Sequence, residues 1–352
     1  MELAEARALF DPAGVYCNTA SYGLPPRPAW EALQAALADW HGGRTSWEGW
    51  GDSVEGSRAS FARLVGVLVE RVAVGSTVSE LVGSVVTALA DGARVVVPDV
   101  EFTSTLFPLL VQPRLEVRTV PPARLPDEIA AGADAAAFSA VQMSTGEVAD
   151  LDAIAEAAAA AGALTICDAT QAAGWLPVDA SRFDAVVCSA YKWLLSPRGT
   201  AFLTLSERLL EAAVPHSAGW YAGEDVHASY FGPPLRLARD ARRFDVSPAW
   251  FSWVGTRPAL ETLEAVGIDT IHEHDVGLAN RFRAGIGLQP SNSAIVSADL
   301  PGAAERLERA GIVAAVRGGR LRTSWHLYND EDDVDRALDA LGSGQRPYGS
   351  LR

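Results

Sequence analysis

Two charged residues that follow apolar, strand-like segments are the strongest candidates for chemistry in this sequence. Lys192 comes shortly after the apolar segment 185–188, and Asp168 comes directly after the apolar segment 164–167. Since the carboxyl ends of parallel strands meet at one edge of a sheet, both side chains could contact one small molecule there. Pyridoxal phosphate (PLP) chemistry needs such a pair. A lysine forms a Schiff base with the cofactor, and a carboxylate keeps the pyridine nitrogen protonated.

Each member of this pair also has an ordinary structural interpretation. Lys192 lies between Tyr191 and Trp193, where burial would lower the pKa of its amine and make it nucleophilic. A surface lysine at the end of a strand is the alternative. Asp168 could instead cap a following helix, with Gln171 as its capping-box partner. In the functional interpretation, Gln171 hydrogen-bonds the phenolic oxygen of the cofactor.

The residues Gly75, Ser76 and Thr77 are candidates for binding a phosphate. They lie between a predicted strand and a predicted helix, which offers backbone N–H groups, two hydroxyls and the positive end of the helix dipole. The same residues are typical of a helix N-cap without any ligand. Ser189 and Tyr191 could donate hydroxyls to the same phosphate, or could simply pack at the end of their strand.

Arg322 is the candidate for binding a substrate carboxylate. It lies in a polar or mixed strand, 320–324, and its guanidinium group fits a carboxylate through two parallel hydrogen bonds. A surface arginine paired with Asp330 or Glu331 is the alternative. The order of a phosphate cap, an aspartate, a lysine and an arginine along the chain carries more weight than any one of them.

The elements that must position these residues follow an alternating pattern. Apolar segments alternate with amphipathic or Ala-rich segments from residue 71 to about residue 210. This pattern predicts an α/β fold with a mostly parallel sheet covered by helices on both faces. The segments that we expect to form its strands are 72–74, 94–97, 116–120, 135–139, 164–167, 185–188 and 200–205.

The pattern changes in the last third of the chain. A stretch rich in Pro, Gly, Trp and Arg, 215–257, leads into what we expect to be one long helix. The remaining segments predict a smaller α+β domain. Its expected strands are 293–297, 311–316 and 320–324, and its expected helices are 303–310 and 331–341.

Composition excludes several other classes of protein. The net charge of −15, with no cluster of basic residues, argues against a nucleic-acid partner. Charged residues or glycines interrupt every apolar stretch before it reaches membrane-spanning length, and the N-terminus does not resemble a signal peptide. The cysteines at positions 17, 167 and 188 have neither metal-ligand spacing nor an even number. We therefore expect a cytoplasmic protein without a metal site.

The order of the motifs resembles the fold-type I PLP enzymes, and within them the class V aminotransferase family. Relatives of that family include the cysteine desulfurases, isopenicillin N epimerase and kynureninase. Segments 168–174 and 189–193 are similar to the family motifs Asp-x-x-Gln and Ser-x-His/Tyr-Lys. Segment 322–335 resembles the motif that contains the carboxylate-binding arginine, and 16–21 resembles an opening segment that reaches the active site.

The resemblance implies roles for further residues. Phe102, or its neighbour, takes the place of a ring that stacks on the cofactor, and Asn18 and Gln142 would lie near the substrate. Ser247 would reach the phosphate of the partner subunit, which implies a homodimer with shared active sites. From the residues alone, Phe102 could equally be a core residue, and Gln142 and Ser247 could be ordinary loop residues.

The resemblance also implies a division of the chain and an activity. We expect an N-terminal segment (1–30), a large PLP-binding domain (31–245), a small domain that includes N-terminal residues (246–342), and a tail (343–352).

The expected function is that of an enzyme that removes the α-proton of an amino acid, first an aminotransferase and second a carbon–sulfur β-lyase. No cysteine follows Cys188, which disfavours a persulfide-forming desulfurase. A non-catalytic PLP-fold binding subunit is the alternative of another class, although the set of Lys192, Asp168 and Arg322 argues against it. An NAD-dependent dehydrogenase would need a Gly-x-Gly-x-x-Gly turn, which is missing here.

Overall fold

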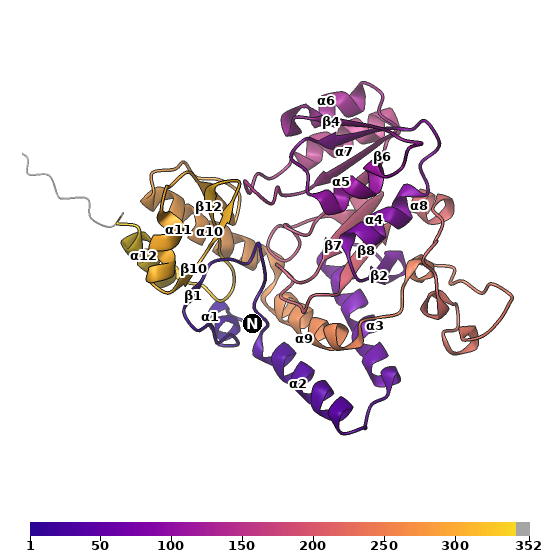
Figure 1. Cartoon of the computed structure of the whole chain (residues 1–352), viewed down its shortest axis with the longest axis horizontal. Helices are drawn as coiled ribbons and strands as arrows, with labels where there is room; N and C mark the ends of the chain where they lie inside the picture. The colour runs from indigo at the N-terminus through magenta and orange to yellow at the C-terminus, as the bar shows by residue number, and fades with distance from the viewer. Residues whose placement is uncertain (343–352) are drawn as a thin grey trace, which may run out of the picture.

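The computed structural model describes residues 1–342, so the predicted tail 343–352 lies outside the described residues. A seven-stranded sheet forms the centre of the larger part (Figure 1). Each strand lies within one residue of its predicted bounds. In spatial order the strands are β2 (Val72–Gly75), β8 (Ala201–Leu205), β7 (Ala185–Ser189), β6 (Leu164–Asp168), β5 (Ala135–Ser139), β3 (Arg94–Pro98) and β4 (Glu116–Val120).

The sheet is mostly parallel, as the sequence predicts. From β7 to β4 every neighbouring pair is parallel. Only β8 runs the other way, since it pairs antiparallel with both β7 and β2. The carboxyl ends of β6 and β7, which precede the candidate aspartate and lysine, therefore lie side by side at one edge.

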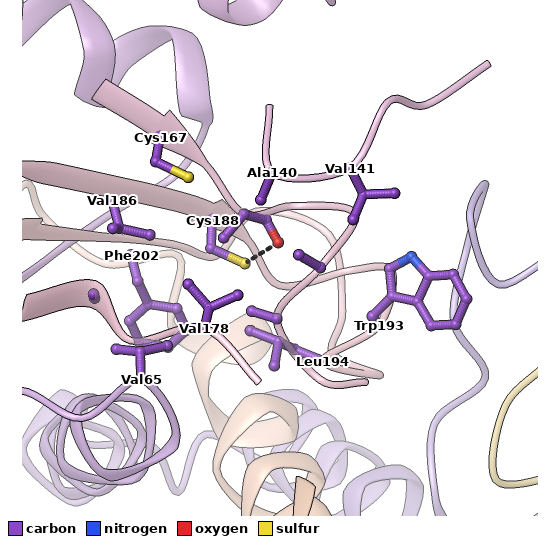
Figure 2. Packing of buried hydrophobic residues seen from close by; sticks show 14 of the residues in the cluster. Val65, Ala140, Val141, Cys167, Val178, Val186, Cys188, Trp193, Leu194 and Phe202 are labelled. Atoms are coloured by element: carbon purple, nitrogen blue, oxygen red, sulfur yellow. Dashed lines mark hydrogen bonds between the residues drawn. The ribbon is translucent and has the colours of Figure 1, made fainter. Parts of the chain in front are cut away.

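Both faces of the sheet are buried except at the edge strand β4, which is mostly exposed, and successive side chains of a strand point to opposite faces. On one face Val187 and Leu203 pack with residues of the covering helices α4 and α8. On the other face Val186, Cys188 and Phe202 belong to the core shown in Figure 2. The helices of this part are α2 (Arg27–His41), α3 (Trp47–Leu64), α4 (Val78–Val86), α5 (Thr103–Leu110), α6 (Leu125–Ala130), α7 (Leu151–Ala161) and α8 (Glu207–Ala212).

The last third of the chain differs from the prediction in two places. Instead of one long helix there are two, α9 (Trp250–Val266) and α10 (Ile268–Gly285), because Gly267 between them has a φ of +92°. The predicted strand 311–316 is split into β10 (Ile312–Val313) and β11 (Ala315–Arg317), because its two halves pair with different partners.

The other elements of this region are close to their predicted positions. Three antiparallel strands form a small sheet in the order β11, β12 (Arg320–Ser324) and β9 (Ile295–Ala298), and two helices accompany them, α11 (Ala303–Arg309) and α12 (Glu331–Ala340). Elsewhere, short 3₁₀ helices form at η1 (Val69–Arg71), η2 (Pro122–Arg124), η3 (Ala180–Arg182), η4 (Trp220–Ala222), η5 (His227–Ser229) and η6 (Ala241–Phe244).

The N-terminal segment lies against this smaller region (Figure 1). After α1 (Leu3–Arg7), strand β1 (Val15–Tyr16) pairs in parallel with β10. The backbone N–H of Ala20 donates to the hydroxyl of Ser324 at 2.9 Å, and the N–H of Gly23 donates to the carbonyl of Tyr191 at 2.9 Å. The segment therefore connects the small sheet to the loop that carries Lys192. Within residues 1–342, no helix combines the length and the apolar character needed to cross a membrane.

Candidate active site

Lys192 lies on the turn that follows β7, and its side chain is buried, with 6% of its surface exposed. Its Nζ atom is 5.6 Å from the ring centre of Phe102 and 5.5 Å from that of Tyr191. Among residues 1–342 it finds no hydrogen-bond or ion-pair partner. It is also the only lysine of the chain. The side chain lines a cavity, so this amine is placed to react with or bind something that the protein itself does not supply.

A cavity of about 280 Å³ brings most of the predicted site residues together. This volume is at the lower end of the range for small-molecule sites. Strand ends, the start of α4, the start of α5 and the lysine turn all contribute to its wall. The predicted residues that line the cavity are Ser76, Thr77, Phe102, Asp168, Gln171, Ser189, Tyr191 and Lys192.

Burial lowers the pKa of Lys192 from its usual 10.5 to about 8. The charge of Asp168 opposes this shift, while the charges of Arg322 and Arg317 add to it. Since only the neutral amine is a nucleophile, the site makes Lys192 reactive at much lower pH than an exposed lysine.

We therefore predict the pH dependence of covalent PLP attachment to the cofactor-free protein. The rate should rise with pH and reach half of its maximum near pH 8, because Lys192 loses its proton there. Stopped-flow absorbance measures this rate. The N-terminal amine can also react with the aldehyde of PLP, so the Lys192→Arg protein, which keeps only that amine, gives the background. A rate that is still rising steeply near pH 10 would contradict the lowered pKa.

Asp168 ends β6 with its carboxylate buried in the same cavity. One oxygen accepts a hydrogen bond from the backbone N–H of Thr170 at 2.8 Å, and the other accepts from the hydroxyl of Thr105 at 3.0 Å. The helix that Asp168 could have capped does not form, since residues 170–176 are turns. Gly174 has a φ of +113° there and packs tightly on the carbonyl of Trp193.

Gln171 lines the cavity, but its amide is already bonded within the protein. Its Nε2 donates to the carbonyl of Ala20 at 2.9 Å, and its Oε1 accepts from the indole of Trp193 at 2.8 Å. It is therefore not the capping partner of Asp168. Gln171 instead links the N-terminal segment to the lysine turn, a contact that its sequence position alone does not reveal.

The candidates for binding a phosphate show features of both interpretations, the helix N-cap and the ligand site. Thr77 caps α4, where its hydroxyl accepts from the N–H of Glu80 at 3.3 Å, and it also lines the cavity. The N–H of Ser76 donates to the carboxylate of Glu80 at 3.0 Å. Gly75 does not line the cavity. A Cβ atom at Gly75 would lie 2.8 Å from a methyl group of Leu81, so packing explains this glycine.

Arg322 is buried beside this cavity, not at the surface. Its guanidinium donates to the carbonyl of Met143 and to the hydroxyl of Ser21, both at 2.7 Å, and Met143 lines the cavity. The alternative that Arg322 pairs with Asp330 or Glu331 is wrong, because Arg322 is 1% exposed and Asp330 pairs with Arg7. Burial, together with the charge of Arg317, lowers the pKa of Arg322 to about 10.

Three other predicted residues lie outside the Lys192 cavity. Gln142 lines a neighbouring cavity and donates to the carboxylate of Glu101 at 3.3 Å. Asn18 forms a β-bridge with Ser324, and its side-chain oxygen is buried without a partner within residues 1–342. Ser247 is exposed on the surface of its own chain.

The structure also brings together residues that sequence reasoning missed. Arg198, in the turn after the lysine, lines the cavity and lies 4.9 Å from the ring centre of Tyr191. Glu101, the residue before Phe102, is buried. Its carboxylate accepts hydrogen bonds from the N–H groups of Phe102 and Ser139 at 2.8 and 2.7 Å. Burial raises the pKa of Glu101. The signal for Glu101 was its position directly beside Phe102, whereas Arg198 lies six residues after Lys192, in the turn that follows it.

None of the three cysteines has the setting of a reactive thiol. Cys17, Cys167 and Cys188 are buried, and burial raises the pKa of each thiol. Figure 2 shows Cys167 and Cys188 in the apolar core, near Val186 and Ala140. A thiol in such surroundings stays protonated and inert.

Gly23 gives a test of how the N-terminal segment supports the lysine turn. A Cβ atom on Gly23 would lie 2.0 Å from the carbonyl oxygen of Lys192, so Gly23→Ala must displace that turn. We predict a roughly hundredfold weaker reaction with amino acids, the order expected for a 1 Å misplacement. Gly277→Ala is the matched control, since a Cβ at that position meets nothing within 4 Å. The prediction fails if both variants show the same spectral response to amino acids as the unmodified protein.

Comparison with known proteins identifies the family of this site. The family model described as aminotransferase class-V matches residues 52–305, which is well over half of the chain. The chain belongs to the class V aminotransferase family. Its members are PLP-dependent enzymes, so the expectation of an enzyme with PLP as cofactor is confirmed.

Individual relatives cover nearly the whole chain. Isopenicillin N epimerase of Streptomyces clavuligerus is 30% identical and covers 97% of this chain and 97% of its own. An uncharacterized aminotransferase of Bacillus subtilis is 27% identical and covers 85% and 86%. Kynureninases and cysteine desulfurases are further relatives. A solved structure of C-DES with glycine covalently linked to its PLP has a TM-score of 0.84, with 19% identity over 97% of this chain and 99% of that one, and confirms the fold.

The residues of the cavity fit PLP. An amine without a partner and a buried carboxylate lie in one cavity with the hydroxyls of Ser76, Thr77 and Ser189. Amine, acid and phosphate-binding groups are the complement that this cofactor needs. Within residues 1–342, no group of three or more His, Cys, Asp or Glu side chains could hold a metal ion.

Proposed function

We propose that this enzyme is an aminotransferase that acts on an amino acid through bound PLP. The observation that carries the proposal is the single unpaired amine of Lys192, which shares a cavity with Asp168 and lies beside Phe102. When bound, PLP supplies an aldehyde that condenses with amines and a ring that accepts the electrons of the substrate α-carbon.

Each side chain of the site has a separate role in the proposed reaction. Lys192 would hold the cofactor and, once free, would move the α-proton of the substrate as base and then as acid. Its pKa of about 8 suits both roles near neutral pH. Asp168 would hold the proton of the ring nitrogen, and Phe102 would stack on the ring. Arg322 would bind the α-carboxylate, with Asn18 and Gln142 as further substrate-binding residues.

The phosphate would be held by hydroxyls and backbone N–H groups at the start of α4, with Ser189 and Tyr191 at the end of β7. Arg198 adds a positive charge at this cavity. Ser247 of the partner subunit would complete the phosphate site in a homodimer. The exposed position of Ser247 on its own chain supports this arrangement, because the hydroxyl is free to reach a neighbour.

A carbon–sulfur β-lyase is the second candidate, since it begins with the same removal of the α-proton. The buried cysteines support a lyase over a persulfide-forming desulfurase, because no reactive thiol among residues 1–342 could accept the sulfur.

Mixing the PLP-loaded protein with single amino acids, including cysteine conjugates, separates these activities. An aminotransferase converts the cofactor to its pyridoxamine form and releases a keto acid. A lyase releases ammonia and a keto acid while the PLP absorbance is restored. The aminotransferase proposal is abandoned if ammonia is released in step with the keto acid and no pyridoxamine form accumulates.

A further inference from the structure

Two arginines, Arg317 and Arg322, donate to one and the same hydroxyl group. The Oγ atom of Ser21 accepts from Nη2 of Arg322 at 2.7 Å and from Nη2 of Arg317 at 3.0 Å. Among residues 1–342, neither guanidinium has a carboxylate within 4.0 Å. The two arginines lack a carboxylate partner although the chain contains 44 acidic residues.

Placing two positive charges on one neutral oxygen costs free energy, which a bound anion would offset. After burial, the charge of Arg317 is the cause that lowers the pKa of Arg322. The Nε atom of Arg322 is buried without a partner within the described residues. Both charges also act on Lys192, where they lower the pKa of its amine. The pair therefore presents two positive charges, and both lie close enough to lower the pKa of Lys192.

The small sheet sets the position of the pair. Arg317 ends β11 and Arg322 lies on the neighbouring strand β12, joined to it by the turn Gly318–Gly319. Arg322 donates a hydrogen bond to the carbonyl of Met143, a residue that lines the Lys192 cavity. Arg320, on the same hairpin, bonds instead to the hydroxyl of Ser297 at 3.1 Å and is exposed.

We propose that Arg317 binds a second anionic group, on the side chain of the substrate, while Arg322 binds the α-carboxylate. One guanidinium satisfies both oxygens of one carboxylate through a bidentate pair of hydrogen bonds. The second guanidinium is then available for another anion. The substrate class is an amino acid with an acidic side chain, such as a carboxylate or a sulfinate. This proposal rests on the proposed function, because it assumes that Arg322 receives an α-carboxylate.

Isosteric substrate pairs test the charge preference. L-aspartate against L-asparagine and L-glutamate against L-glutamine differ in side-chain charge at almost constant shape. The absorbance change of bound PLP gives the Kd of each. We expect the unmodified protein to prefer the acid of at least one pair by about tenfold or more, as for a charge-assisted hydrogen bond. Arg317→Gln should bring this ratio close to one, whereas Arg320→Gln, the matched control, should keep it.

Two outcomes overturn the proposal. Arg317→Gln could weaken the acid and the amide equally, which would make Arg317 a second ligand of the α-carboxylate. The unmodified protein could also show no preference within either pair.

Calorimetry on the cofactor-free protein separates this proposal from the proposed function. Succinate, which has two carboxylates and no amine, should bind more tightly than butyrate, and Arg317→Gln should remove the difference. If succinate behaves in this way but no amino acid changes the PLP spectrum, the proposed function fails and the anion pair stands. If succinate shows no advantage, the anion pair fails.

Discussion

The Lys192→Ala protein is expected to lack the visible absorbance band of covalently bound PLP and to lose at least about 10³-fold in turnover. Lys192 is the only lysine of the chain, and its amine lies in the cavity without a partner among the described residues. No other ε-amine can replace it. An absorbance spectrum of the PLP-loaded variant, together with turnover of the best substrate, measures both losses.

Two further measurements make the Lys192 prediction specific. Lys192→Arg keeps a positive charge but cannot attach an aldehyde, so it should lose the band as completely as the alanine variant. Borohydride reduction of the unmodified protein followed by peptide mass analysis should place the added mass on the peptide that contains Lys192. A visible band that survives in either variant would show that PLP is held elsewhere.

The Asp168→Asn protein should lose about 10²-fold or more in turnover, the order seen when one electrostatic contact to a reacting group is removed. The loss has two causes. The negative charge that holds the ring proton disappears. In addition, the two oxygens of Asp168 accept hydrogen bonds from the N–H of Thr170 and the hydroxyl of Thr105, so the amide of asparagine keeps the first bond through Oδ1 and reverses the second, with the hydroxyl of Thr105 accepting from Nδ2. Replacing the charged acceptor by a neutral group weakens these bonds, at a cost of about 1 kcal/mol. Turnover and thermal unfolding report the two causes separately.

Asp184→Asn is the matched control for Asp168→Asn. Asp184 also accepts from a backbone N–H and a hydroxyl, both of Thr165, and it pairs in addition with Arg208. It precedes β7, at the opposite end of the sheet from Lys192. This control should lose stability and keep its turnover once folded. Equal turnover losses in the two variants would remove the special role of Asp168. Thr105→Val, which removes one donor and no charge, should have a smaller effect on turnover than Asp168→Asn.

The sequence predicts the central sheet well, for a physical reason. Apart from the edge strand β4, which is mostly exposed, each strand is a short and mainly apolar run, and burial on both faces makes that pattern strong even in one sequence. Because the strand ends were placed correctly, Asp168 and Lys192 were expected at one edge, and the structure places both in one cavity. The departures lie in the last third of the chain, where the positive φ of Gly267 divides the expected long helix and the expected strand 311–316 splits between two partners.

Contacts between distant segments could not be predicted in the same way. The amide of Gln171 bonds to Ala20, which lies far away in the sequence, and periodicity carries no information about such a pair. Arg317 falls between the expected strands 311–316 and 320–324, and its meeting with Arg322 on Ser21 depends on where the N-terminal segment lies against the small sheet. These contacts depend on tertiary packing, which local patterns do not specify.

The burial of the only lysine also determines how the protein reacts with reagents that modify amines. Its 28 arginines supply every other positive side chain apart from histidine, so an acylating label can find two amines, the N-terminus and Lys192. The two differ in access, because Lys192 is enclosed between aromatic rings. Labels of increasing size should therefore stop reacting with Lys192 at a size set by the mouth of the cavity. The ratio of the two labelled amines would then measure, in solution, how widely this active site opens.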